Sequence, residues 1–293
     1  MSNCPTFCAA CLLFCTALPA LVDAAELRVV TTIRPVHSLV AAVMVQGQPS
    51  LLYSGTESPH ETALRPSQAR ALQAADLIVR IDAGFETALR RPLRTMASGA
   101  TILTLSQAAG VTRLPRRGEG STGTDPHIWL DPRNAATMVR AIADALAALD
   151  PQHANALRAR AEQAAVEFSR LDSKIAALLA GHPPAFVAGH DAFQYLEARY
   201  GLQAVGALIG PDGSRLGVRG SRELRRRALA AKAGCVLDDG PIPGRLARTL
   251  AADLGARLVS FDVLGSNLEP GPGLYPALLR QGTKILAACL GKP

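Results

Sequence analysis

The sequence predicts an α/β protein of two lobes, each built on a parallel sheet, that are joined by one long rigid helix. Three observations indicate this fold. From residue 26 onward, short apolar stretches alternate with stretches of helical spacing, which is typical of parallel βαβ units. One helical stretch is much longer than a crossover between neighbouring strands requires. With 293 residues, the chain is also long enough to build two cores.

The first lobe is expected to span residues 25–149. A β-branched run over 27–33 predicts its first strand, and the stretch 35–45 that follows has helical spacing. The segment 110–125 is rich in Gly, Arg, Ser and Pro and has no apolar periodicity, which predicts a surface loop. Further strands are predicted at 50–53, 76–81 and 100–105, and further helices at 66–74, at 85–93 and from Pro132 onward.

The linking helix is expected over residues 150–182. Asp150 supplies an N-cap acceptor, and Pro151 follows at the first helical position. Apolar residues at helical spacing then continue to about residue 180, which gives a rod of ~45 Å at a rise of 1.5 Å per residue. Residues 183–293 are expected to form the second lobe, with strands at 185–188, 203–209, 235–237 and 257–261 and helices at 192–200, 222–232, 242–254 and 275–290.

Residues 1–24 are expected to be a signal peptide. Residues 6–21 are apolar and small, and small residues near position 24 suit cleavage. Cys8, Cys11 and Cys15 in the apolar stretch raise the alternative of a lipoprotein. However, Phe14 precedes Cys15, where a small residue is needed, and Cys11 lies very early in the segment. We therefore expect an exported, periplasmic protein without a lipid anchor.

The composition disfavours two other classes of protein. The formal charge is +7, but the arginines are scattered and aromatic residues make up only 4% of the chain, so we expect no binding to nucleic acid. No interior stretch is apolar over the 18 or more residues that a membrane-spanning helix needs. We expect a monomer.

Two cysteines, Cys235 and Cys289, lie beyond the expected signal peptide. An even pair in an oxidising compartment predicts a disulfide bond between the start of a strand and the last helix. The alternative is two buried free thiols.

Three histidines share one kind of context. His60, His127 and His190 each adjoin a turn, and each has a carboxylate nearby in the sequence. His60, His190 and Asp262 follow predicted strands, and ligands of open α/β sheets bind at the carboxyl ends of strands. Three imidazoles and one carboxylate form a tetrahedral set suited to Zn²⁺. A site for Mn²⁺ or Mg²⁺, which prefer oxygen ligands, would have a carboxylate in place of His190.

The chain resembles the metal-binding solute receptors of bacterial ABC importers, in the zinc branch of the zinc and manganese receptor family. The resemblance is carried by TTIRPVHSLVAAVM, SPHETALRPSQARALQAADLIV, DPHIWLDPRNA, GHDAFQYLEARYGL and FDVLGSNLEPGPGLYPALL, in the order of the family. It implies capture of Zn²⁺ in the periplasm and its delivery to an ABC permease of the inner membrane. It also implies a metal site in the cleft between the lobes and no enzymatic activity.

By this resemblance, His60, His127 and His190 correspond to the three histidine ligands, and Asp262 to the carboxylate of the family's DPLG motif. Here the motif is DVLG, so the loop after Asp262 lacks the stiff proline. The histidine-rich loop of many zinc receptors has no counterpart, since the segment 110–125 contains no histidine. The pair Cys235 and Cys289 also resembles a disulfide of the zinc receptors.

Three further residues are candidates to support the ligands. Glu61 beside His60 and Asp191 beside His190 could orient the imidazoles, as carboxylates around metal sites commonly do. His37, at the start of a helix of the first lobe, could approach the cleft.

Other functions remain open at this point. A receptor for manganese or another divalent metal would use the same scaffold. A zinc-dependent hydrolase would use three histidines and a bound water, but His60-Glu61 does not continue into an HExxH motif. A surface adhesin on the same scaffold is a third alternative.

Overall fold

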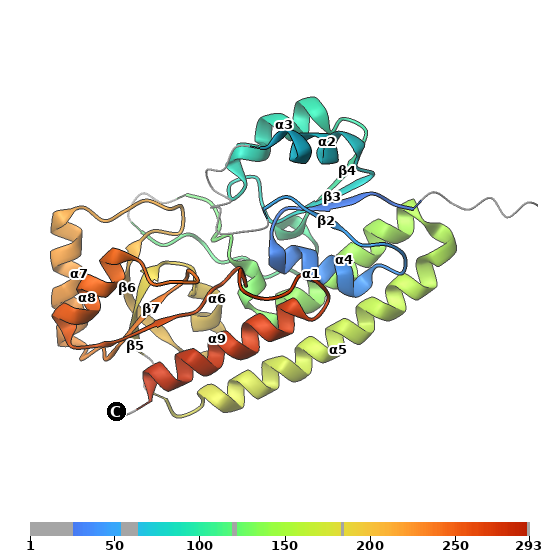
Figure 1. Ribbon diagram of the computed structural model, residues 1–293. Helices are drawn as coiled ribbons and strands as arrows, with labels where there is room; N and C mark the ends of the chain where they lie inside the picture. The colour runs from blue at the N-terminus through green and yellow to red at the C-terminus, as the bar shows by residue number, and fades with distance from the viewer. Residues whose placement is uncertain (1–25, 54–63, 119–121, 183–184, 292–293) are drawn as a thin grey trace, which may run out of the picture.

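The computed structural model describes residues 26–53, 64–118, 122–182 and 185–291, which form two parallel four-stranded sheets (Figure 1). The first sheet has the strand order β2-β1-β3-β4, and the second has the order β6-β5-β7-β8. The strands of the first sheet are β1 (Val29–Thr31), β2 (Ser50–Leu51), β3 (Leu77–Arg80) and β4 (Thr101–Thr104). Those of the second are β5 (Ala185–His190), β6 (Gln203–Ile209), β7 (Cys235–Asp238) and β8 (Arg257–Ser260).

Prolines mark the beginnings of several helices, as the sequence predicts. Pro35 and Pro66 occupy the first turns of α1 and α2, where a missing N–H is not needed. Asp131 caps α4, because its carboxylate accepts a hydrogen bond from the backbone N–H of Arg133 at 2.8 Å. The helices of this part of the chain are α1 (Arg34–Val43), α2 (Pro66–Ala74), α3 (Arg90–Met96) and α4 (Pro132–Leu149).

The predicted linking helix is present as α5 (Ala154–Leu179), which is 26 residues long. In Figure 1 it runs along the lower side of both lobes, antiparallel to α4 and beside α9 (Leu274–Leu290). The outer side of the second sheet carries α7 (Val218–Ala230) and α8 (Arg245–Leu254), while α6 (Gln194–Tyr200) lies near the first lobe. The fold is thus two parallel α/β lobes joined by one long helix.

One hydrophobic core runs through both lobes. It contains strand residues of the first lobe, such as Val30, and of the second lobe, such as Leu237, together with buried Trp129 and Tyr275. The hydroxyl of Tyr275 donates to the carbonyl of Trp129 at 2.8 Å. Its backbone N–H donates to Ser38 of α1 at 2.9 Å. These contacts join helical segments of the two lobes across this core.

The predicted disulfide is formed between Cys235 at the start of β7 and Cys289 near the end of α9, with the two Cα atoms 5.5 Å apart. Both cysteines are buried. The bond ties an inner strand of the second sheet to the helix that packs on α5. Among the helices that the structure describes, none has both the length and the apolar character to cross a bilayer.

Candidate metal site

His127 and His190 come from different lobes and lie side by side. His190 is the last residue of β5, and His127 immediately precedes a short 3₁₀ helix, Ile128–Leu130, that leads into α4. The centroids of the two rings are 5.1 Å apart, and the ring planes are inclined by 77°. Both side chains are almost fully buried. The structure therefore brings together two of the four predicted ligands.

Each of these imidazoles is oriented by an aspartate. Nδ1 of His127 is 2.8 Å from a carboxylate oxygen of Asp125, and the same oxygen accepts the backbone N–H of His127 at 2.9 Å. Nδ1 of His190 is 2.6 Å from a carboxylate oxygen of Asp239. A carboxylate on Nδ1 fixes the tautomer in which Nε2 carries the lone pair that a metal ion coordinates. Each imidazole therefore has its Nδ1 engaged by an aspartate.

Asp239 also sets the charge of the pair. Burial lowers the pKa of His190, but the hydrogen bond and negative charge of Asp239, with smaller contributions from Asp191 and Asp125, outweigh burial and raise it above the ordinary value. Burial raises the pKa of Asp239, but its hydrogen bond to His190 and the nearby charges of His190 and His127 lower it overall. The hydrogen bond between Asp239 and His190 thus favours the charged form of each partner.

Gly189 makes the close approach of β7 possible. It precedes His190 in β5, and a side chain at this position would collide with the carboxylate of Asp238. The glycine thus lets the end of β7, which carries Asp238 and Asp239, lie against the end of β5.

Asp262 lies just beyond β8, as predicted, but its carboxylate binds its own loop. It accepts the backbone N–H groups of Leu264, Gly265 and Ser266 at 3.1, 3.0 and 2.6 Å. The loop is held near His127, because the indole N–H of Trp129 donates to the carbonyl of Val263 at 2.9 Å. Local N–H donors thus hold this carboxylate in a loop that lacks the family's proline.

His60 and Glu61 lie outside the described residues. Within the described residues, no group of three or more His, Cys, Asp or Glu side chains is placed to hold a metal ion. The complete ligand set of His60, His127, His190 and Asp262 therefore stays a prediction.

The expected supporting residues differ from those that the structure places beside the imidazoles. The carboxylate of Asp191 accepts hydrogen bonds from the guanidinium of Arg117. His37 is buried in α1, with Nε2 3.0 Å from the carbonyl oxygen of Pro49, and burial lowers its pKa. Asp125 and Asp239 were not among the residues predicted from the sequence. Two features of the sequence could have pointed to them: an aspartate two residues before His127, and an Asp-Asp pair at the carboxyl end of β7.

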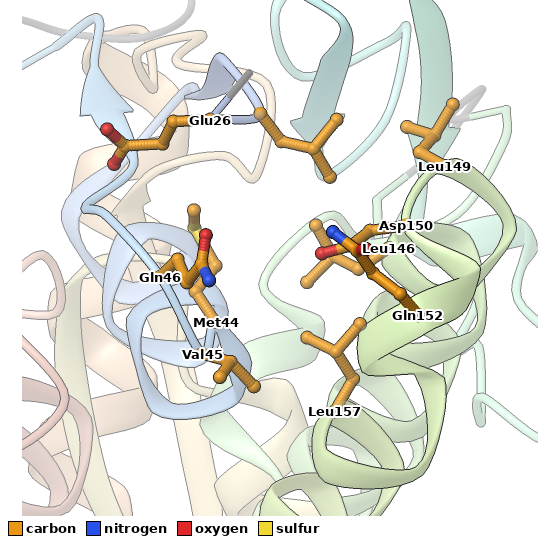
Figure 2. A pocket seen from close by; sticks show the side chains of 10 residues that line it. Glu26, Met44, Val45, Gln46, Leu146, Leu149, Asp150, Gln152 and Leu157 are labelled. Atoms are coloured by element: carbon orange, nitrogen blue, oxygen red, sulfur yellow. The ribbon is translucent and has the colours of Figure 1, made fainter. Parts of the chain in front are cut away.

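A small cavity elsewhere in the molecule is unrelated to this site. It has a volume of about 70 Å³ and lies between the end of α1 and the turn from α4 to α5 (Figure 2). Leu146, Leu149 and Leu157 form one side of it, and Glu26 and Gln46 lie on the other. None of the predicted ligands lines this cavity.

Comparison with solved structures shows which fold the chain shares. A zinc-bound deletion mutant of ZnuA matches with a TM-score of 0.80 at 23% sequence identity, over 92% of this chain and 100% of that one. At this level of identity the match shows a shared fold of two α/β lobes.

The family follows from sequence. The model of the family "ZnuA: Zinc-uptake complex component A periplasmic" matches residues 29–289. The high-affinity zinc uptake system protein ZnuA of Paracoccus denitrificans is 31% identical over 310 residues, covering 94% of each chain. Its counterpart in Brucella suis is 30% identical over 306 residues, covering 90% of this chain and 92% of the relative. The chain belongs to the ZnuA family.

Proposed function

We propose that this protein captures Zn²⁺ in the periplasm and delivers it to an ABC permease for zinc uptake. The observation that carries the proposal is the pair His127 and His190, which come from different lobes with ring centroids 5.1 Å apart. Each ring has an aspartate on Nδ1. The names of the relatives, which are high-affinity zinc uptake proteins, support the same function. Membership of a family of uptake components makes the chain a solute receptor rather than an enzyme.

We propose His60, His127, His190 and Asp262 as the ligands of the zinc ion. Three imidazoles and one carboxylate suit zinc better than manganese, which prefers oxygen ligands. For Asp262 to bind the ion, its carboxylate must exchange part of its contacts with the loop N–H groups, or use the remaining lone pairs of its oxygens.

Capture is proposed to involve little movement of the lobes. The core that runs through both lobes and the bonds of Tyr275 to Trp129 and Ser38 oppose a wide hinge motion. We also propose an exported monomer with a signal peptide at 1–24, lobes at 25–149 and 183–293, and a linking helix at 150–182.

Titration of the metal-free protein with zinc tests the proposal. We expect one Zn²⁺ per chain, with saturation followed by the fluorescence of Trp129. This residue is the single tryptophan of the chain, and its ring centroid lies 5.3 Å from that of His127. Calcium, which prefers oxygen ligands, serves as the control ion and is expected not to bind. A stoichiometry far from one, or no binding of zinc, would contradict the proposal.

Zinc affinity is expected to depend on pH through His190. Zinc binds the neutral imidazole, so protons compete with the metal. Because the pKa of His190 lies above its ordinary value of 6.5, affinity should begin to fall at a pH above 6.5 and continue to fall as the solution becomes more acidic. In Asp239→Asn, burial acts without the opposing carboxylate, so the fall should move to lower pH. Zinc affinity measured from pH 5 to pH 8 in both proteins checks this; identical profiles would contradict it.

A further inference from the structure

The segment predicted as a surface loop before His127 is an antiparallel strap. We define the strap as residues 114–118 and 122–125. Its two arms pair through the N–H of Asp125, which donates to the carbonyl of Leu114 at 2.8 Å, and the N–H of Arg116, which donates to that of Gly123 at 3.1 Å. The second arm ends at Asp125, the residue that orients His127. Contacts that hold the strap in place therefore also help to position His127.

Helix α6 of the second lobe holds both arms of the strap. The hydroxyl of Tyr195 accepts the N–H of Leu114 at 3.1 Å and donates to the carbonyl of Asp125 at 2.9 Å. The side-chain amide of Gln194 donates to the carbonyl of Pro115 at 3.1 Å. Tyr195 is 1% exposed, so these bonds are shielded from water. In the sequence the strap is part of the first lobe. These hydrogen bonds attach it to α6 of the second lobe.

Arg117 adds a charged fastening between the strap and the second lobe. Its guanidinium donates to both carboxylate oxygens of Glu197 at 2.8 Å. It also donates to both oxygens of Asp191, from Nε at 3.2 Å and from Nη2. The two carboxylates are 7% and 8% exposed, and a buried carboxylate without a cation is costly. The planar fork of arginine can serve both at once, which a lysine ammonium cannot do as well.

The position of Asp191 connects this fastening to the metal site. Asp191 directly follows His190, so Arg117 joins the strap, whose second arm ends at Asp125, to the residue next to His190. Asp125 in turn is bonded to His127, so the contacts of Arg117 link the surroundings of the two imidazoles across the lobes. Ligands held in place before the metal arrives lose less conformational entropy on binding, and the complex is tighter.

We propose that Arg117 is a positioning residue for metal capture: by clamping Asp191 and Glu197 it sets His127 against His190 before the ion binds. The inference rests on the proposed function, since it assigns a role at that same site. Arg117 does not contact the metal; it acts through the carboxylates and the strap.

The test compares the zinc affinity of Arg117→Leu, Arg117→Lys and the control Arg113→Leu, each measured by competition with a chelator. Arg113 precedes the strap and is exposed, so its replacement removes the same charge without touching Asp191 or Glu197. We expect a loss of roughly 10-fold in Arg117→Leu, in the range found when groups around a metal site are removed. We expect roughly 3-fold in Arg117→Lys, whose ammonium serves one carboxylate at a time, and no change in Arg113→Leu.

A second readout separates positioning from loss of stability. The visible absorption of the Co²⁺-loaded protein reports the geometry of the ligands, and a variant that is only less stable would keep the spectrum of the unmutated protein. We expect an altered spectrum in both Arg117 variants. Unchanged affinity together with an unchanged spectrum in either folded variant would overturn the proposal. Failure of the proposed function looks different, because the unmutated protein itself would then bind no zinc.

Discussion

Replacing His127 with alanine is expected to lower the affinity for zinc by at least about 100-fold. Groups that only support a metal ligand cost ~10–100-fold when they are removed, so the loss of a ligand should cost more. His127 is 2% exposed, and its Nδ1 is bonded to Asp125, so alanine removes both the imidazole and this bond from a buried position. Zinc affinity measured by competition with a chelator, at a pH where His190 is neutral, gives the result.

The chain offers a matched control for this substitution. His153 has the same kind of partner, with its Nδ1 2.7 Å from a carboxylate oxygen of Asp150, but it lies at the turn between α4 and α5. His153→Ala should therefore remove an equivalent aspartate–histidine pair and leave zinc affinity unchanged. Circular dichroism and thermal unfolding should show that both variants are folded. Equal affinities in the two variants would show that His127 is not a ligand.

Local sequence patterns predict most of the secondary structure of this chain. Strands, helices and the long linking helix follow from apolar periodicity and from the Asp-Pro starts of α4 and of the turn before α5, because these signals lie within each element. His127 and His190, which were chosen by their sequence contexts, lie with their ring centroids 5.1 Å apart, and their role as ligands stays a prediction. Side-chain partners from other elements were harder to predict, because they depend on how the elements pack.

Asp239 shows why the carboxylate partner on Nδ1 of His190 could not be predicted from the sequence. The carboxylate of Asp191, the aspartate adjacent to His190, is bound by the guanidinium of Arg117. The partner instead comes from β7, which pairs in parallel with β5 and ends at the same edge of the sheet. Strand order, which the sequence does not state, decides which carboxylate reaches the imidazole.

The strap shows a second limit. Composition without apolar periodicity predicts a loop, because the usual signals of order are hydrophobic. Here the segment is fixed by hydrogen bonds and charge pairs to Tyr195, Glu197 and Asp191, which lie more than 70 residues further along the chain. Polar contacts between distant segments leave no periodic pattern, so the ordering of these residues could be found only in the folded structure.

Removing the disulfide, by replacing Cys235 and Cys289 together with alanine, is expected to lower the free energy of unfolding by about 2–4 kcal/mol. The bond closes a loop with a sequence separation of 54 residues, and a crosslink of that span restricts the unfolded chain considerably. Alanine is preferred to serine because both sites are buried, and a hydroxyl there would lose its bonds to water. For a chain of this size the melting temperature should fall by roughly 5–15 °C.

The same variant should leave zinc affinity nearly unchanged, and this distinguishes a bond that supports the fold from one that supports the site. Cys235 lies at the start of β7, whereas Asp239 lies just past its other end, and the pairing of β7 with β5 and β8 still fixes that end of the strand. Unfolding by denaturant with and without a reductant provides the internal control. The reductant should destabilise the unmutated protein and have no effect on the double alanine variant. If the unmutated protein and the double alanine variant were equally stable without reductant, the prediction would be wrong. Packing alone would then hold β7 against α9.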